Sequence, residues 1–129
     1  ARGLLWASQV AHGNANALRL RVYGTEGGLE WAQEEPERLW FAPAGMPRQV
    51  ILRGTAGTAP EAARLSRVPG GHPEGYLERF GNVNAEIARA IRGDTAAAYP
   101  TVADGARGVR FVAAVVRSSA AGGVWVPVG

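Results

Sequence analysis

The amino-acid sequence predicts an α+β fold, a mainly antiparallel β-sheet with two α-helices packed on one face. Three observations predict this class. The first half contains five short runs of strand-forming residues joined by turns, and the second half contains two segments with the apolar spacing of helices. Valine alternates with other residues from 124 to 128, which indicates a final strand. With 129 residues, the chain is expected to form one domain, residues 1–129.

The expected strands are short and closely spaced. They cover residues 4–11, 17–23, 29–33, 38–42 and 49–53. The run 17–23 is the clearest, because Leu20 and Val22 fall on one face while Arg21 and Tyr23 fall on the other. Turns rich in glycine, asparagine or proline separate the runs. Connections this short favour an antiparallel meander.

A long loop with one possible helical turn, residues 60–67, is expected between 54 and 71. Loops of this length inside a small domain are more often functional than idle. A helix is expected next, because apolar residues recur every three or four positions from Tyr76 to Ile91. Pro73 near its start and Gly93 just after its end are typical helix boundaries.

The second expected helix runs from Thr101 to about Ala120. Thr101 is followed three residues later by Asp104, which resembles a capping box with Asp in place of the usual Glu. The pair of glycines at 122–123 is expected to end this helix.

Composition narrows the chemistry. The chain has no Cys, and all 14 basic residues are Arg, so it has no Lys. Missing Cys excludes disulfides and thiol catalysis and agrees with a cytoplasmic location, whereas missing Lys excludes a Schiff base and a P-loop. No apolar run has the roughly 18 to 20 residues that cross a bilayer, so no membrane association is expected. The arginines are interleaved with 11 acidic residues, so nucleic-acid binding is not expected.

The remaining motifs indicate no metal and no cofactor bound by this chain. His12 and His72 lie in separate loops without metal-ligand spacing. No G-x-G-x-x-G follows a strand, so the backbone cradle for a pyrophosphate is missing, and the glycines at 24–28 indicate a hairpin turn. A solvated turn is expected around Pro36, where three acidic residues gather, Glu34, Glu35 and Glu37.

The segment 67–76, RVPGGHPEGY, stands out. It places His72 directly before Pro73 and after Gly70 and Gly71, which would let the backbone approach another group closely. Two interpretations stay open. His72 is either the N-cap of a helix that begins at Pro73, or a residue that faces a ligand. A histidine is not a favoured cap, so the first interpretation does not explain the residue type.

At this segment the sequence resembles a known family. The segment VPGGHPEGY resembles part of the C-terminal domain of Gfo/Idh/MocA oxidoreductases, the relatives of glucose-fructose oxidoreductase and inositol dehydrogenase. The same resemblance extends to residues 78–83 (ERFGNV), residues 100–105 (PTVADG) and Ser118–Ser119 ahead of Trp125. Upstream, the runs 8–13 and 22–31 match the strand and turn pattern of the same domain.

The resemblance implies a two-domain NAD(P)-dependent dehydrogenase that acts on a sugar, polyol or related compound. Its Rossmann domain binds NAD or NADP, and this chain is the partial C-terminal domain that supplies the substrate side and commonly the oligomer contact. Since helices on one face of a sheet leave the other face open, Trp40 or Tyr23 there would favour a homo-oligomer through the open sheet face. The family's catalytic lysine and its Asp-x-x-x-His pair have no counterpart here, so the isolated chain is expected to be inactive. The residues expected to bind substrate are His72, Tyr76 and Gly71.

A second hypothesis is a non-enzymatic α+β module that associates with itself. The aromatic residues Trp6, Tyr23, Trp31 and Trp40 suit an interface, and equally suit a core covered by helices.

Overall fold

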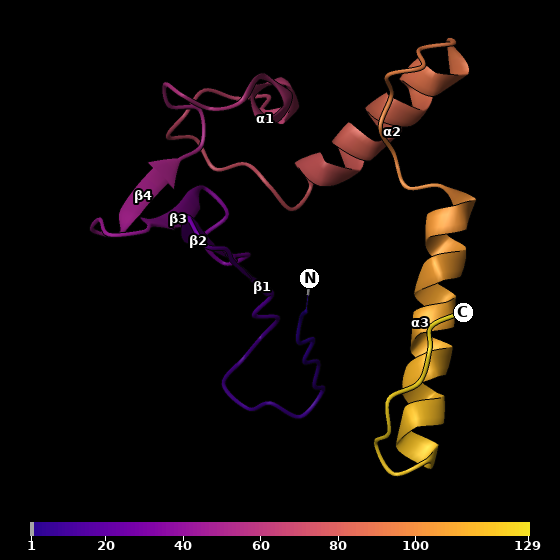
Figure 1. Ribbon diagram of the computed structural model, residues 1–129. Helices are drawn as coiled ribbons and strands as arrows, with labels where there is room; N and C mark the ends of the chain where they lie inside the picture. The colour runs from indigo at the N-terminus through magenta and orange to yellow at the C-terminus, as the bar shows by residue number, and fades with distance from the viewer. Residues whose placement is uncertain (1) are drawn as a thin grey trace. The chain divides into compact units, whose positions relative to one another are not determined.

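The computed structural model describes residues 2–129, and within this range the chain forms four strands and three helices (Figure 1). It divides into two compact units, one that runs to Glu78 and one from Arg79 to Gly129. The first unit contains the sheet and a short helix. The second contains most of one long helix and all of another.

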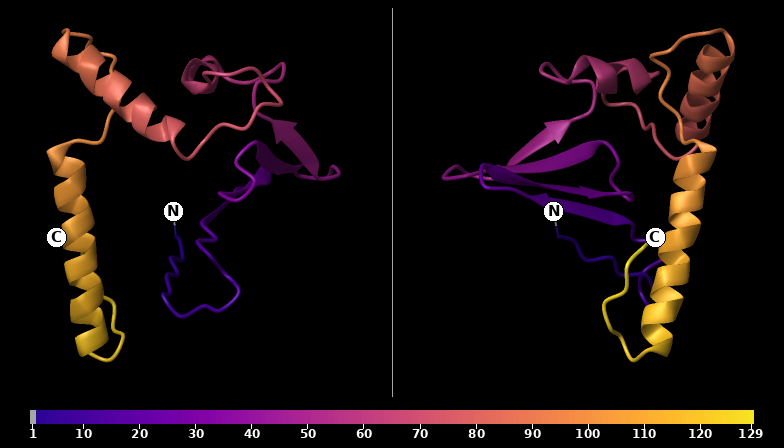
Figure 2. Two further views of the ribbon diagram at one scale, coloured as in Figure 1. Left: turned by 180° about the vertical axis from the view of Figure 1, so that it is seen from behind. Right: turned by 45° about the vertical axis from the view of Figure 1, so that its right-hand side comes forward.

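The sheet is an antiparallel meander, which confirms the predicted α+β class. Its strands pair in sequence order (Figure 2, right) and have the following bounds: β1 Arg19–Tyr23, β2 Gly27–Ala32, β3 Arg38–Pro43 and β4 Gln49–Leu52. These four strands lie within or beside the runs expected from the sequence, because short turns let consecutive strands pair.

The register divides the sheet into two chemically different faces. One face, here the apolar face, carries a row across all four strands, Leu20, Trp31, Leu39 and Ile51. The other, here the mixed face, carries the neighbouring row, Arg21, Glu30, Trp40 and Val50. Side chains alternate along a strand, so Tyr23 shares the mixed face with Arg21. This alternation confirms the two faces predicted for residues 17–23.

Ion pairs and a cation–π contact occupy the mixed face. Glu30 lies between two arginines, with 3.8 Å from its Oε1 to Nε of Arg21 and 3.1 Å from its Oε2 to Nη2 of Arg48. The guanidinium carbon of Arg48 also lies 4.2 Å from the centre of the Trp40 ring. These contacts hold the Trp40 ring and both arginines together on one surface.

The three helices are α1 Pro60–Leu65, α2 Glu78–Ile91 and α3 Val102–Ala120. The capping box predicted for α3 is confirmed, because Thr101 Oγ1 accepts from the Asp104 N–H while Asp104 Oδ2 accepts from the Thr101 N–H. Gly122 and Gly123 follow the helix with positive φ, as expected. The packing of α2 and α3 on the sheet stays a prediction.

Two predicted strands are absent from the described residues. Residues 4–11 and 124–128 form no ladder with any other strand. Leu4 is 96% exposed and Trp125 fully so, and alternation of apolar residues cannot make a strand without a pairing partner. The start of α2 is also corrected. The helix begins at Glu78 rather than at Pro73, because residues 73–77 form a turn whose polar groups are used in other contacts described below.

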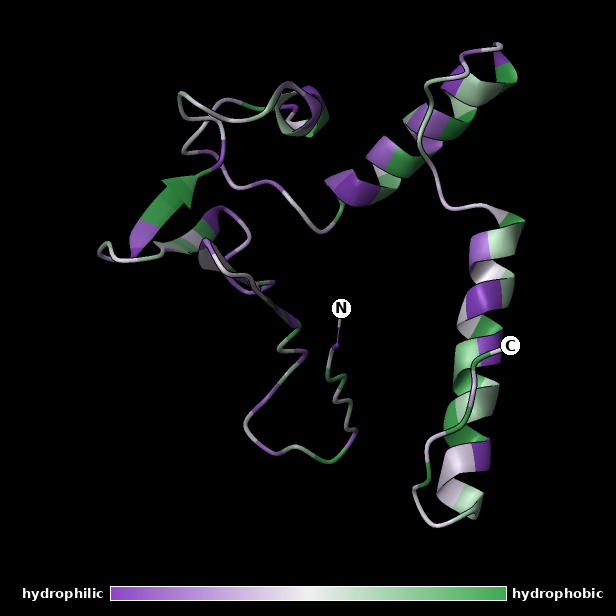
Figure 3. Ribbon diagram, in the orientation of Figure 1, coloured by the Kyte–Doolittle hydropathy of each residue, from purple (hydrophilic) through white to green (hydrophobic). Residues whose placement is uncertain are grey.

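Few of the described residues are buried. Ala114 is the apolar one, and the polar ones are Glu74 and Glu86, one in each unit. On the apolar face, Leu20 is 57% and Ile51 40% exposed, and Figure 3 shows the apolar run of β4. No helix within residues 2–129 is long and apolar enough to cross a membrane. Each of these two buried carboxylates belongs to an ion-pair cluster described below.

Candidate functional site

Arg53, the residue that follows β4, anchors the segment 67–76 to the sheet. Its backbone N–H donates to the carbonyl of Glu37 at 3.0 Å, which extends the pairing of β3 and β4 by one step. Its side chain is 17% exposed, with Nε 2.8 Å from Glu37 Oε2 and Nη1 2.8 Å from Glu74 Oε2. A single guanidinium therefore pairs with one carboxylate from the turn between β2 and β3 and one from the segment itself.

The same guanidinium donates to two backbone carbonyls of the segment. Nη1 donates to the carbonyl of Val68 at 2.9 Å, and Nη2 donates to the carbonyl of His72 at 2.7 Å. Arginine suits this role because its N–H donors are arranged in a fixed planar fork. The Val68 and His72 backbones are held at a fixed spacing by one side chain.

Glu74 is the most buried charged group of the first unit. Its Oε1 accepts from the backbone N–H of Arg67 at 2.7 Å, and its own backbone N–H donates to Glu37 Oε1 at 3.0 Å. Glu37 therefore bridges the Arg53 side chain and the Glu74 backbone. The expectation of a merely solvated turn is wrong for Glu37. Its carboxylate is half-buried, and each of its two oxygens accepts a hydrogen bond, one from Arg53 and one from the Glu74 backbone.

Two glycines let the chain cross itself beside Arg53. A Cβ on Gly70 would lie 3.0 Å from the Arg53 carbonyl oxygen, and a Cβ on Gly54 would lie 3.0 Å from the backbone N of Gly70. Gly54 also has φ +72°. The sequence predicted a close backbone approach at Gly70, and in the described chain its partner is the protein's own backbone.

Gly71 and His72 form the exposed turn that this anchor supports. Gly71 has φ +86°, and open space surrounds the position of its missing Cβ, so the backbone conformation favours glycine there. His72 donates its backbone N–H to the Pro69 carbonyl at 3.3 Å, and its ring Nδ1 lies 3.2 Å from the same oxygen. Because a carbonyl only accepts, Nδ1 carries the hydrogen of this bond. In the neutral ring, Nε2 is then an acceptor.

The N-cap interpretation of His72 is wrong, because α2 starts at Glu78. The Glu78 side chain marks the true start, since its Oε2 accepts from the Gly75 N–H at 2.8 Å. That backbone hydrogen bond lowers the pKa of the Glu78 carboxyl. Tyr76 lies in the turn before α2 rather than in its first turn, and its side chain is exposed.

The structure therefore places the three predicted substrate residues, Gly71, His72 and Tyr76, in one exposed segment of the first unit. Sequence reasoning missed the groups that hold this segment, which are Arg53, Glu37 and Glu74. A local signal exists only for Glu74, which belongs to the motif itself. The contacts of Arg53 join residues far apart in the sequence and leave no periodic pattern.

A second ion-pair cluster lies in the second unit. Arg89 Nη1 donates to both oxygens of Glu86 at 2.9 Å, and its Nε donates to Asp94 Oδ2 at 2.8 Å. Glu86 also accepts from the Ala98 N–H at 2.9 Å. The N–H of Ala96 and the Arg89 guanidinium together lower the pKa of Asp94. This cluster fastens the chain after α2 back onto the helix, which is a structural role.

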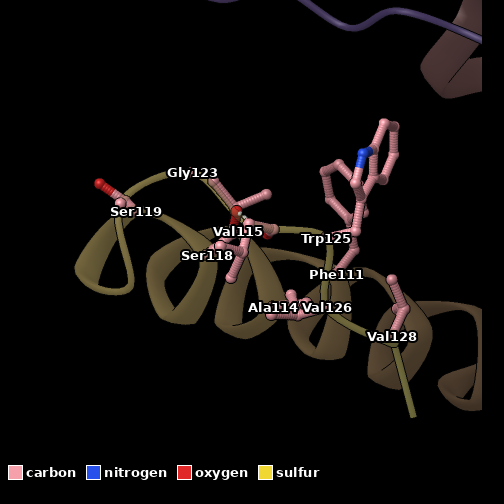
Figure 4. Close-up of a pocket in the computed structure, with 11 residues that line it drawn as sticks. Phe111, Ala114, Val115, Ser118, Ser119, Gly123, Trp125, Val126 and Val128 are labelled. Carbon is pink, nitrogen blue, oxygen red and sulfur yellow. Dashed lines mark hydrogen bonds between the residues drawn. The ribbon is translucent and has the colours of Figure 1, made fainter.

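An apolar pocket of about 650 Å³ lies along α3 (Figure 4). The segment that carries Trp125, Val126 and Val128 folds back beside the helix and forms one wall. Ser118 Oγ donates to the Val124 carbonyl at 2.6 Å, and Arg117 Nη2 to the Pro127 carbonyl at 3.1 Å, which keeps this segment in place. No titratable side chain lines this pocket, so its walls supply no acid or base.

In the part of the chain that the structure describes, no three His, Cys, Asp or Glu side chains lie close enough together to bind a metal ion.

Comparison with known proteins places these features in context. Residues 1–128 match the family model described as the oxidoreductase family, C-terminal alpha/beta domain. The oxidoreductase YfiI of Bacillus subtilis (strain 168) is 30% identical over 96% of this chain and 34% of its own length. The chain thus spans about a third of that relative.

Solved structures agree with this match. An oxidoreductase from Sinorhizobium meliloti is 54% identical with a TM-score of 0.88, over 93% of this chain and 35% of that one. An inositol dehydrogenase homologue from Azotobacter vinelandii, solved with NADH and myo-inositol, is 38% identical with a TM-score of 0.86, over 94% of this chain and 34% of that one.

Proposed function

Since the chain belongs to the Gfo/Idh/MocA oxidoreductase family as a C-terminal α/β domain, we propose that it is the substrate-side domain of an NAD(P)-dependent dehydrogenase. The substrate class is a sugar, a polyol or a related polyhydroxylated compound. The observation that carries this proposal is the exposed turn at His72, whose ring Nδ1 lies 3.2 Å from the Pro69 carbonyl oxygen, so that Nε2 is the ring nitrogen left for a ligand. A relative solved with NADH and myo-inositol supports the same substrate class.

The role proposed for His72 is to bind and orient one substrate hydroxyl. A hydroxyl donates and accepts hydrogen bonds, and an imidazole offers both a donor and an acceptor. Tyr76, four residues further along the same segment, has a phenol that donates and accepts, which suits a second hydroxyl. Gly71 contributes a bare backbone beside the ring. Orientation of the substrate is the contribution of this domain, because a bound and aligned substrate reacts faster than a free one.

The residues of this chain do not fit a dinucleotide. A pyrophosphate is bound at helix N-termini that offer free N–H groups and no negative charge. The N-terminus of α3 is closed by the Asp104 carboxylate, and that of α2 carries the Glu78 carboxylate, which already accepts from Gly75. We therefore propose that NAD or NADP is bound elsewhere in the whole protein, and that proton and hydride transfer are not performed by this chain.

Association of the whole protein with itself through the mixed face is the second part of the proposal. Tyr23 is 77% exposed on this face, and the Glu30 carboxylate pairs with arginines on both sides. Aromatic rings and arginines are enriched at protein interfaces. A cytoplasmic site of action is consistent with a chain that needs no disulfide.

The test is a substrate screen with the full-length protein that contains this chain. NAD and NADP are each combined with myo-inositol, other polyols and sugars, and reduced nicotinamide is followed by absorbance. Turnover with at least one polyhydroxylated compound is expected, and the isolated chain should bind neither dinucleotide in calorimetry. A full-length protein that associates with itself but oxidises none of these compounds would favour the non-enzymatic module instead.

A further inference from the structure

The geometry points to Arg53 as a positioning residue that fixes the substrate-binding turn through the backbone of His72. This inference rests on the proposed function, in which the His72 ring contacts substrate. Arg53 itself is 17% exposed in its side chain, and its donors are used inside the protein. It would therefore act on substrate affinity only through the turn that it holds.

The contacts of Arg53 set the turn from both sides. The guanidinium donates to the carbonyl of Val68, ahead of the turn, and to the carbonyl of His72, at the end of the turn. Inside that span, His72 is tied to Pro69 by its backbone N–H and by its ring. The position of the His72 ring is thus fixed relative to Pro69, and the position of the whole turn is fixed relative to β4. A shift of the Arg53 donors would displace Nε2 together with the turn.

Two carboxylates fix the plane of the guanidinium. Glu37 approaches Nε and Glu74 approaches Nη1, each at 2.8 Å, from different segments of the chain. A planar fork held at two of its nitrogens has little freedom to rotate, so the two carbonyl contacts are directional. Buried ion pairs add little net stability when compared with well-packed apolar residues. The two carboxylates instead give the Arg53 guanidinium, and through it the turn, a defined geometry. A functional side chain needs such rigid support from the residues around it.

The crossing of Gly54 and Gly70 adds a steric constraint to this electrostatic one. The backbones approach so closely that a Cβ on either glycine would lie 3.0 Å from a backbone atom of the facing segment. The chain entering the turn therefore rests directly on the chain that leaves β4. Arg53 stands at this crossing, since its carbonyl oxygen is the atom nearest to the missing Cβ of Gly70.

The experiment uses the full-length dehydrogenase and the polyol that it oxidises best. Arg53→Lys keeps the charge but cannot reach two carboxylates and two carbonyls at once. We expect KM for the polyol to rise about three- to tenfold, the effect of a hydrogen bond lost through misplacement, with kcat changed less than KM. Arg38→Lys is the matched control, because Arg38 pairs with Glu35 on the surface and is 54% exposed. Its KM should stay at the wild-type value.

A double-mutant cycle separates positioning from general stability. In a His72→Ala background, Arg53→Lys should raise KM by clearly less than it does alone, because the group that it positions is already gone. If Arg53→Lys does not fold, Glu37→Gln replaces it in the same cycle, since the amide cannot accept from both Arg53 and Glu74.

The outcomes are distinguishable. An equal rise of KM in both backgrounds, or a folded Arg53→Lys enzyme with wild-type KM, would overturn the positioning role while His72→Ala still weakens substrate binding. A wild-type protein without activity on any polyhydroxylated compound would instead overturn the proposed function.

Discussion

Nη1 of Arg53 and Oε2 of Glu74 lie 2.8 Å apart, although the whole of α1 separates the two residues in the sequence. The Glu74 side chain is 4% exposed, so its charge depends on this partner and on the N–H of Arg67. The pair joins the end of the sheet to the segment that precedes α2. The stability of the sheet unit and the geometry of the candidate site therefore depend on the same contact.

Glu74→Ala should destabilise the first unit strongly. Removal of one partner leaves the Arg53 charge inside the protein with only Glu37 to balance it. The expected loss is about 3 kcal/mol, the lower end of the range for broken buried pairs, because Glu37 remains. Urea unfolding of the full-length protein, followed by tryptophan fluorescence, measures it. Glu35→Ala is the control, since Glu35 is 58% exposed and its loss should cost less than about 0.5 kcal/mol. Equal midpoints for the two variants would contradict the prediction.

Replacement of glycine by alanine should have opposite signs at two positions. Gly70→Ala places a Cβ 3.0 Å from the Arg53 carbonyl oxygen and should cost roughly 1 to 3 kcal/mol, as for other overpacked sites. Gly108→Ala lies within α3 with no neighbouring atom within 4 Å, and should gain up to about 1 kcal/mol from helix propensity. Differential scanning calorimetry of both variants tests the contrast, which a stabilised Gly70→Ala protein would refute.

Local patterns predicted the elements that depend on local interactions. The alternation around Leu20 and the Thr101–Asp104 pair each fix their element from neighbouring residues, and both were predicted correctly. Residues 4–11 carry a strand-like composition, but a strand also needs a partner edge, which composition does not encode. The start of α2 was misplaced because Pro73 is compatible with a first helical turn, whereas the contacts of Glu74 and Gly75 hold the chain in a non-helical turn.

The candidate site divides in the same way. His72 and Gly71 could be selected from the sequence because they form a compact motif. The role of Glu37 could not, because a carboxylate beside Pro36 is usually solvated, and only the fold brings Arg53 within 2.8 Å of it.

His72→Ala in the full-length enzyme should lower kcat/KM for the polyol. The decrease should correspond to a loss of roughly 1 to 3 kcal/mol of transition-state stabilisation, as expected when a polar substrate group loses its partner. His12→Ala is the matched control, because His12 lies in the loop before β1 and is also exposed. Steady-state kinetics of both variants decide the matter. Full activity of the His72→Ala enzyme would remove His72 from the site and leave Tyr76 without its main support.

The capping box makes the stability of α3 depend on pH. Hydrogen bonds from the backbone N–H and the hydroxyl of Thr101 lower the pKa of Asp104 below its ordinary value of 3.8. A depressed carboxyl pKa stabilises the folded form above the unfolded pKa, and this contribution is lost as the pH falls through the folded pKa. Asp104 is the only acidic residue between Tyr99 and Val124, so one group accounts for the change.

An amidated peptide of residues 99–124 isolates this effect. Its helix content, measured by circular dichroism in a fixed fraction of trifluoroethanol, should fall between pH 6 and pH 2 in the wild-type sequence. Asp104→Asn should remove the pH dependence. Thr101→Ala should lower the helix content at pH 6 by an amount equivalent to about 1 kcal/mol, the usual cost of a lost cap. A wild-type peptide whose helix content does not change with pH would show that the capping box contributes nothing.

The mixed face of the sheet provides the last prediction, which concerns self-association. Glu30 is the carboxylate that separates Arg21 from Arg48, and Arg48 in turn stacks on Trp40. Glu30→Arg would place a third positive charge among these groups, and like charges at a desolvated interface cost several kcal/mol. If two copies meet through this face, the full-length variant should dissociate at concentrations where the wild type stays associated. Glu61→Arg, the same substitution on exposed α1, should leave the assembly unchanged. Light scattering coupled to size exclusion gives the molar mass of each. An associated Glu30→Arg protein, or a wild type that is monomeric at high concentration, would contradict association through this face, because neither is compatible with an interface centred on Glu30.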